Sequence, residues 1–177
     1  MDRSTAYSRR STDAPGGEPS RAILGFYMRI RELDRVECGE ILSRTELGRL
    51  ACARHSQPYI VPIHFSFDAA RQCLYAFSTV GQKVDWMREN PLVCVEVEEI
   101  VDKNHWTTVL IFGRYEELTD SPDDASARRT AQTLFDKRPE WWFPAAAKTD
   151  SGERHAMVVY RIVIDRMTGW RASRGQP

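Results

Sequence analysis

The chain has 177 residues, of which 25 are Lys or Arg and 25 are Asp or Glu, so its formal net charge at pH 7 is zero. This length predicts a single domain whose core is large enough to need no disulfide or metal staple. The balanced charge excludes the basic surface typical of proteins that bind nucleic acid or an anionic membrane. A small molecule or a second copy of the chain is the expected partner.

Residues 1–22 are rich in Ser, Arg, Pro and Gly and contain few apolar side chains, a composition typical of a flexible tail. We therefore assign the folded domain to residues 23–177. The first residues lack the hydrophobic core of a signal peptide, and no apolar run is long enough to cross a bilayer. The four cysteines form no CxxC pair, which is typical of reduced, buried thiols and of a cytoplasmic protein. They are Cys38, Cys52, Cys73 and Cys94.

The first expected helix runs from Asp34 to about Ser43, after a short lead-in over residues 23–33. Asp34 is a favourable N-cap, and Glu37 three residues later can complete a capping box.

From Gly48 onward, short apolar or alternating runs predict strands over residues 49–56, 58–67, 73–79, 92–100, 105–118 and 155–164. Short connections favour antiparallel pairing, and closure removes exposed strand edges. Pro62 cannot donate a ladder hydrogen bond, so its strand is expected at an edge or at a bulge. We predict a mainly β (α+β) fold, a six-stranded antiparallel barrel with flanking helices.

The segment from Gln72 to Pro91 changes from strand to helix chemistry at Gly81. The strand ends with Ser78 and Thr79, and Gln82 and Lys83 lie in the first turn of the helix that follows. Free N–H groups and the positive end of the helix dipole make this a candidate phosphate site, because Lys in a first turn is unfavourable without an anion nearby. The alternative is an ordinary turn with a surface helix and a solvated Lys.

Two further segments have local signals. Residues 121–124, Ser-Pro-Asp-Asp, predict a helix start with Ser121 as the cap and Pro122 in the first position. The aromatic cluster Trp141-Trp142-Phe143 suits a pocket wall, a subunit interface or core packing under a loop. Its role stays open.

Several chemistries lack support in the sequence. The four histidines, His55, His64, His105 and His155, match no HExxH or zinc-type spacing, so we expect no metal site. No GxSxG, GxxxxGK[ST] or GxGxxG motif is present, which argues against acyl hydrolysis, P-loop nucleotide hydrolysis and Rossmann dinucleotide binding.

Three segments in this order, PYIVPIHFSF, LYAFSTVGQKVDWMRENPLVCVEV and HWTTVLIFGRYEEL, resemble the pyridoxamine 5′-phosphate oxidase-like, FMN-binding split-barrel family. The resemblance covers about residues 26 to 170 and is strongest to the flavin-nucleotide-binding branch that includes nitroimidazole-resistance proteins. It implies a homodimer of split barrels with FMN bound at each of two sites across the dimer interface.

The resemblance also assigns residues to the cofactor. Tyr59, Val61, Pro62, Ile63 and His64 match the strand whose backbone meets the flavin ring, and Phe77, Ser78, Thr79, Gln82 and Lys83 match the phosphate and ribityl segment. Trp106, Thr107 and Thr108 match a segment that reaches the flavin from the other subunit. Residues 168–171 match a C-terminal element near the same site.

Three departures from the family pattern limit what is carried over. Gln82 stands where a second basic residue is common, Thr107 replaces a common Arg, and Phe77 replaces the His of nitroimidazole-resistance proteins. Nitro-group reduction is therefore not carried over. The C-terminal Arg and His pattern of true pyridoxamine-phosphate oxidases is absent, so vitamin B6 oxidation is not expected.

The leading hypothesis is an FMN-dependent oxidoreductase in which hydride passes through the flavin, with His64 or Trp106 touching the substrate. The alternative is a flavin- or haem-binding module without turnover of its own, with His64 and His105 as the haem-ligand candidates. A deazaflavin cofactor would require more positive charge than this segment offers. The substrate, the electron donor and the catalytic residues are not identifiable from the sequence.

Overall fold

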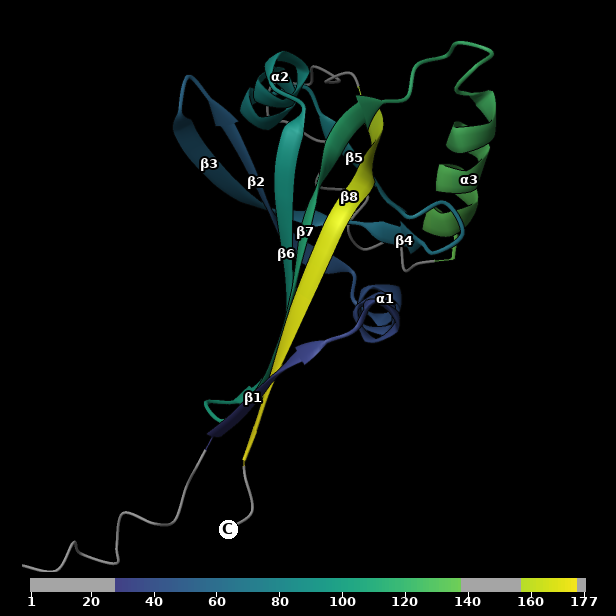
Figure 1. The fold of residues 1–177 in the computed structure, drawn as a ribbon. Helices are drawn as coiled ribbons and strands as arrows, with labels where there is room; N and C mark the ends of the chain where they lie inside the picture. Colours follow the sequence, from purple (N-terminus) through teal and green to yellow (C-terminus); the bar gives the residue numbers. More distant parts are fainter. Residues whose placement is uncertain (1–27, 138–156, 175–177) are drawn as a thin grey trace, which may run out of the picture.

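The computed structural model describes residues 28–137 and 157–174, which form eight β-strands and three α-helices (Figure 1). The strands are β1 (Met28–Leu33), β2 (Leu47–Arg54), β3 (Gln57–His64), β4 (Ser66–Asp68), β5 (Cys73–Thr79), β6 (Leu92–Asp102), β7 (His105–Glu117) and β8 (Met157–Arg174). The helices are α1 (Arg35–Arg44), α2 (Gln82–Glu89) and α3 (Ala125–Phe135). The predicted tail at residues 1–22 and the Trp141-Trp142-Phe143 cluster lie outside the described residues.

All strands belong to one antiparallel sheet with the order β3-β2-β6-β7-β8-β5-β4, and β1 pairs with β8 outside this path. The sheet is not closed, so the expected α+β split barrel is confirmed. Its β3 strand lies at the edge, where Pro62 faces Arg49 of β2 on one side only. The edge position predicted from Pro62 is therefore confirmed.

The predicted number of six strands was too low. The lead-in contains β1, and the predicted second strand is divided into β3 and β4 at Phe65, whose N–H bonds to the Glu46 carbonyl at 3.0 Å. Strand β8 also extends to Arg174, ten residues beyond its predicted end, and this extension pairs with β1. Each of these segments is stabilised by a distant partner, which local periodicity does not reveal.

Two hydrophobic clusters pack against the sheet. The larger cluster fills the barrel and includes Ile41 and Leu42 of α1 and Val84 and Met87 of α2, all fully buried. The smaller cluster lies between α3 and strand β5. Cys38, Cys52 and Cys73 are buried as expected, whereas Cys94 is only half-buried, and the four described cysteines form no disulfide with one another.

Helix α1 begins as predicted, because Asp34 accepts a hydrogen bond from the Glu37 N–H at 2.9 Å and the Glu37 carboxylate accepts one from the Asp34 N–H at 3.1 Å. Helix α3 begins at Ala125, four residues later than its predicted cap Ser121. The carboxylate of Asp124 accepts hydrogen bonds from the N–H and hydroxyl of Thr119 and from the Ser121 hydroxyl. These bonds hold residues 121–124 in a separate turn.

Among the described residues, no helix has both the length and the apolar composition needed to span a bilayer.

Candidate functional site

The turn between β5 and α2 leaves the start of the helix open. Gly81 occupies the N-cap position and provides no side-chain hydrogen bond to the helix. Apart from its chain neighbours, no atom of the described residues lies within 4 Å of a Cβ atom placed on Gly81, so there is space beside the N-cap position. The first N–H groups of a helix have no partner within the helix. This end of α2 can therefore accept an anion.

Lys83 places a positive charge at the same position. Its side chain is half-buried near the Cys52 thiol, and burial lowers the pKa of the ammonium. Within residues 28–137 and 157–174, no carboxylate forms an ion pair with Lys83. A partly buried charge without a counter-ion is unfavourable. An anionic ligand would provide the missing partner.

The residues at the end of β5 point to opposite sides of the sheet. Ser78 is 8% exposed and donates a hydrogen bond to the Thr79 carbonyl at 3.0 Å. Phe77 faces α3 instead, where its ring meets Phe135 edge to face at 5.1 Å between centroids. Because side chains alternate along a strand, Phe77 and Ser78 cannot both point at one group. Gln82, in the first turn of α2, is exposed.

Strand β3 contributes residues on both of its faces. Ile63 is buried in the barrel core, and Tyr59 and Val61 pack against the same core. The ring of Tyr59 lies 5.4 Å from that of Trp86, which joins β3 to α2 beside the open helix end. Pro62 is exposed and His64 is half-buried, both on the outer side of the strand. The structure thus places β3 beside the Lys83 turn.

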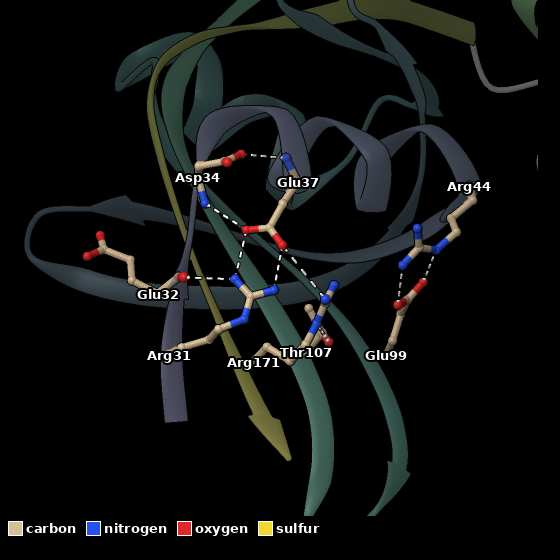
Figure 2. A network of polar contacts seen from close by, with 8 residues as sticks. All are labelled: Arg31, Glu32, Asp34, Glu37, Arg44, Glu99, Thr107 and Arg171. Atoms are coloured by element: carbon tan, nitrogen blue, oxygen red, sulfur yellow. Dashed lines mark hydrogen bonds and ion pairs between the residues drawn. The ribbon is translucent and has the colours of Figure 1, made fainter. Parts of the chain in front are cut away.

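The three predicted residues of β7 do not share one face. Thr107 is 7% exposed and points inward, where its hydroxyl accepts a hydrogen bond from Arg171 Nε at 3.3 Å (Figure 2). Arg171 also lies 3.8 Å from Glu37, which pairs with Arg31 at 2.5 Å. Trp106 and Thr108 point to the outer side, and the buried hydroxyl of Thr108 has no hydrogen-bond partner among the described residues.

The β7 residues lie far from the Lys83 turn within one chain. Ser78 pairs with Val158 near the start of β8, whereas Thr107 pairs with Arg171 near its end. The intervening length of β8 spans roughly 40 Å along the strand. Figure 1 shows α2 near one end of the long strands and the β6–β7 turn near the other. The end of β5 and the three β7 residues therefore lie towards opposite ends of the long strands.

The outer side of the sheet carries exposed apolar residues. They include Leu47, Ile60, Leu92, Ile100, Phe112 and Trp170, which are 37% to 65% exposed. We call this surface the outer face. Apolar patches of this kind mark interaction sites in soluble proteins. The outer face connects the β3 edge to the β7 residues.

One neighbour of the turn was missed in the sequence. Cys52 lies close to Lys83, and the buried hydroxyl of Tyr160 lies close to Cys52. Within the described ranges this hydroxyl also has no hydrogen-bond partner. The alternation of β2 identifies Cys52 as an inward residue. No local signal brings it to Lys83, because this approach depends on how α2 packs on β2.

Each ring nitrogen of His105 lies close to a polar group. Nδ1 of His105 lies 2.9 Å from the Asp102 carboxylate, and its Nε2 accepts a hydrogen bond from the Arg174 N–H at 3.4 Å. Both ring nitrogens are engaged, which disfavours His105 as a haem ligand. In the described part of the chain, no three His, Cys, Asp or Glu side chains converge as a metal site would require.

Comparison with known sequences gives a family. The profile of the family described as pyridoxamine 5′-phosphate oxidase matches residues 34–171. An uncharacterized protein of Rhizobium meliloti is 38% identical over 152 residues, which cover 84% of this chain and 99% of that protein.

Solved structures share the fold. An FAD-binding protein from Mesorhizobium loti is 37% identical, with a TM-score of 0.68 and coverage of 83% of this chain and 99% of its own. A putative 5-nitroimidazole antibiotic resistance protein from Bacteroides thetaiotaomicron is 18% identical, with a TM-score of 0.60 over 86% of this chain and 94% of its own. An FAD-binding protein from Mycobacterium smegmatis is 19% identical, with a TM-score of 0.57 over 82% and 100%.

Proposed function

The chain belongs to the pyridoxamine 5′-phosphate oxidase family, and on this basis we propose that it is an FMN-dependent oxidoreductase whose flavin site is shared by two copies of the chain. The observation that carries the proposal is Lys83, which is half-buried beside the open start of α2 and has no carboxylate partner among the described residues. This turn would hold the flavin phosphate through the Lys83 ammonium and the first N–H groups of the helix. The similarity to an FAD-binding protein of Mesorhizobium loti supports a flavin over another phosphate ligand.

The shared site follows from the separation of the two groups of residues. If Trp106 and Thr108 contact the same flavin as Lys83, they come from the second copy of the chain. The outer face supports such an arrangement, because apolar patches of this kind mark interaction sites and no described residue bonds to the Thr108 hydroxyl. Thr107 points away from this face and instead helps to fix β7 against Arg171.

A bound flavin would supply the hydride chemistry, accepting or donating a hydride at its ring. The protein residues bind and orient it. Lys83 and α2 would hold the phosphate, and the backbone of Tyr59 to His64 would lie along the ring. The apolar surroundings of Trp106 would exclude water. His64 and Trp106 are the proposed substrate contacts.

Flavin titration of a Lys83→Ala variant tests the proposal. Loss of a charge-assisted contact to phosphate is expected to weaken FMN binding by at least about tenfold. The exposed Lys137 provides a matched control, because Lys137→Ala removes an equal charge outside the turn. Fluorescence quenching of FMN measures both affinities. Full FMN affinity in Lys83→Ala would refute the phosphate assignment.

Reduction of the bound flavin distinguishes the proposed oxidoreductase from the alternative, a flavin-carrying module without turnover. The proposed oxidoreductase is expected to accept electrons from a nicotinamide dinucleotide or another donor and to pass them to an acceptor over repeated cycles. Bound flavin that no donor reduces in a screen would favour the carrier.

A further inference from the structure

A hollow beside α3 is not used by the proposed FMN site. It has a volume of about 270 Å³ and lies between α3 and the adjoining parts of β5 and β8. Phe77, Phe135, Met157 and Val159 form its apolar wall. Arg128 and Arg129 of α3 form its charged edge.

The charged edge has positive charge in excess. Arg128 donates to the Leu118 carbonyl at 2.8 Å and pairs with Asp120 at 3.1 Å, but the Asp120 side chain is 95% exposed. Arg129 is exposed and forms no ion pair with any residue in the described ranges. An anionic group in the hollow would meet two guanidinium groups and one well-solvated carboxylate. Guanidinium groups are well suited to phosphate.

The hollow lies close to the proposed flavin phosphate site. Phe77 in its wall precedes Gly81 by four residues, a distance of about 13 Å in extended chain. Met157, also in the wall, pairs with Thr79 at the end of β5. A ligand with an apolar ring and a phosphate, held on the α3 side of β5, would pass around the end of β5 at Thr79 to reach the open start of α2.

The polar residue Gln132 adds a further property to the hollow. Its amide nitrogen donates a hydrogen bond to the Asp136 carboxylate at 2.6 Å, and its amide oxygen accepts no hydrogen bond from the described residues. A flat ring that carries an amino group, joined to a phosphate, combines the features that this hollow offers: an apolar wall, a hydrogen-bond acceptor and cationic edges. Adenosine phosphates have these features.

We infer that the α3 hollow binds an adenosine phosphate, supplied as the adenylate of FAD or as the adenylate of a nicotinamide dinucleotide that reduces the flavin. The inference rests on the proposed function, because both sources place the adenylate next to a bound flavin. With FAD, the Lys83 turn and the hollow hold the two halves of one cofactor. With a dinucleotide, FMN occupies the Lys83 turn and the donor occupies the hollow.

Three ligands test the inference on the full chain: FMN, FAD and AMP, each titrated by calorimetry. The variant is Arg129→Gln, and the control is Arg35→Gln, which changes an exposed Arg of α1 bonded only to Gln72 among the described residues. For the FAD source, FAD is expected to bind about tenfold more tightly than FMN, and Arg129→Gln is expected to remove this advantage while FMN affinity stays unchanged. For the dinucleotide source, FMN and FAD bind equally, and NADPH or AMP binds the FMN-loaded protein and weakens about tenfold in Arg129→Gln.

A second variant is included because the loss of one Arg can have only a small effect on affinity. Met157→Glu places a carboxylate in the wall and is expected to weaken the adenylate ligand further, because its charge repels the phosphate. Equal affinity for FMN and FAD, with no binding of AMP or NADPH, would overturn the inference and leave the FMN site standing. If no flavin binds at all, the proposed function fails. AMP binding that Arg129→Gln weakens would then still support the hollow, and no AMP binding would overturn it.

Discussion

The ammonium of Lys83 lies near the Cys52 thiol, and burial lowers the pKa of this ammonium from the ordinary value of 10.5. Below the lowered pKa, the folded chain carries the full cost of a buried charge. The cost falls as pH rises through the folded pKa, and it disappears above the unfolded value. A ligand phosphate would offset the same cost. The flavin-free protein is therefore expected to be less stable than a variant without this charge.

Lys83→Met tests this trade-off, because Met has a similar unbranched shape without the charge. At pH 7 the flavin-free variant is expected to melt at a higher temperature than the wild type, while its flavin affinity falls at least about tenfold. The difference in melting temperature should shrink as pH approaches 10.5. Thermal scans at several pH values measure it. A lower melting temperature for the variant at pH 7 would show that Lys83 stabilises the free fold.

Glu37 links three elements through its carboxylate, which accepts a hydrogen bond from the Asp34 N–H at the start of α1, pairs with Arg31 of β1 and lies near Arg171 of β8 (Figure 2). The hydrogen bond from Arg31, followed by that from the Asp34 N–H, lowers the pKa of Glu37 to about 2. A carboxylate with a lowered folded pKa stabilises the protein above its unfolded value of 4.5, and this contribution is lost as pH falls towards 2.

Glu37→Gln is therefore expected to reduce the fall in melting temperature of the chain between pH 4.5 and pH 2. Glu40 is the control, because it is exposed on the same helix and forms no ion pair within the described residues. Glu40→Gln should retain the wild-type slope. Equal slopes for all three proteins would mean that Arg31 does not favour the charged form of Glu37.

At the scale of elements, the bulge where β7 meets β8 depends on Gly113. A Cβ atom on Gly113 would lie 2.3 Å from the Val163 carbonyl oxygen, in the stretch where the β7–β8 register shifts. The backbone there has no room to move, because β7 continues between β6 and β8.

Gly113→Ala is expected to lower the free energy of unfolding by about 1–3 kcal/mol through overpacking. Gly39 is the matched control, because a Cβ there would meet only Phe67 at 3.8 Å, inside helix α1. Gly39→Ala should raise the free energy of unfolding by roughly 0.5–1 kcal/mol. Urea denaturation measures both changes, and a neutral Gly113→Ala would show that the strands separate easily.

Sequence periodicity predicted the elements whose signals are local. The β5–Gly81–α2 segment, the capping box at Asp34 and the edge position of Pro62 were predicted correctly because each depends on neighbouring residues or on the chemistry of one residue. Pairing of β1 with the end of β8 was not predicted, since its partner lies at the far end of the chain.

The candidate site was only partly predictable. The sequence placed Lys83 at the start of a helix, and the structure adds that the Lys is half-buried and lacks a described carboxylate partner. The alternation of β5 implies that Phe77 and Ser78 diverge, but the contact of Phe77 with α3 depends on tertiary packing. For the same reason the α3 hollow had no local signal.

At the scale of the whole molecule, a flavin site shared by two chains requires that the outer face pairs with a second copy. Ile100 is 65% exposed on this face and lies opposite Trp106 in the β6–β7 ladder. Ile100→Glu is expected to weaken the dimer by about a hundredfold or more, because a charge is costly in an apolar interface. Its flavin affinity should fall together with the dimer.

Val36→Glu is the control, because Val36 is 70% exposed on α1, away from the outer face. Sedimentation of the wild type and both variants, with and without flavin, measures the fraction of each protein that is dimeric. A wild-type monomer that binds flavin with full affinity would show that one chain is sufficient.

The most direct test of the flavin assignment is the absorption spectrum of the purified wild-type protein, followed by titration with FMN. Flavin binding at the Lys83 turn predicts the bands of an oxidised flavin, or tight and saturable uptake of one FMN per chain. A protein that has no flavin bands and takes up no FMN would contradict it, and the open start of α2 would then bind a different anion or none.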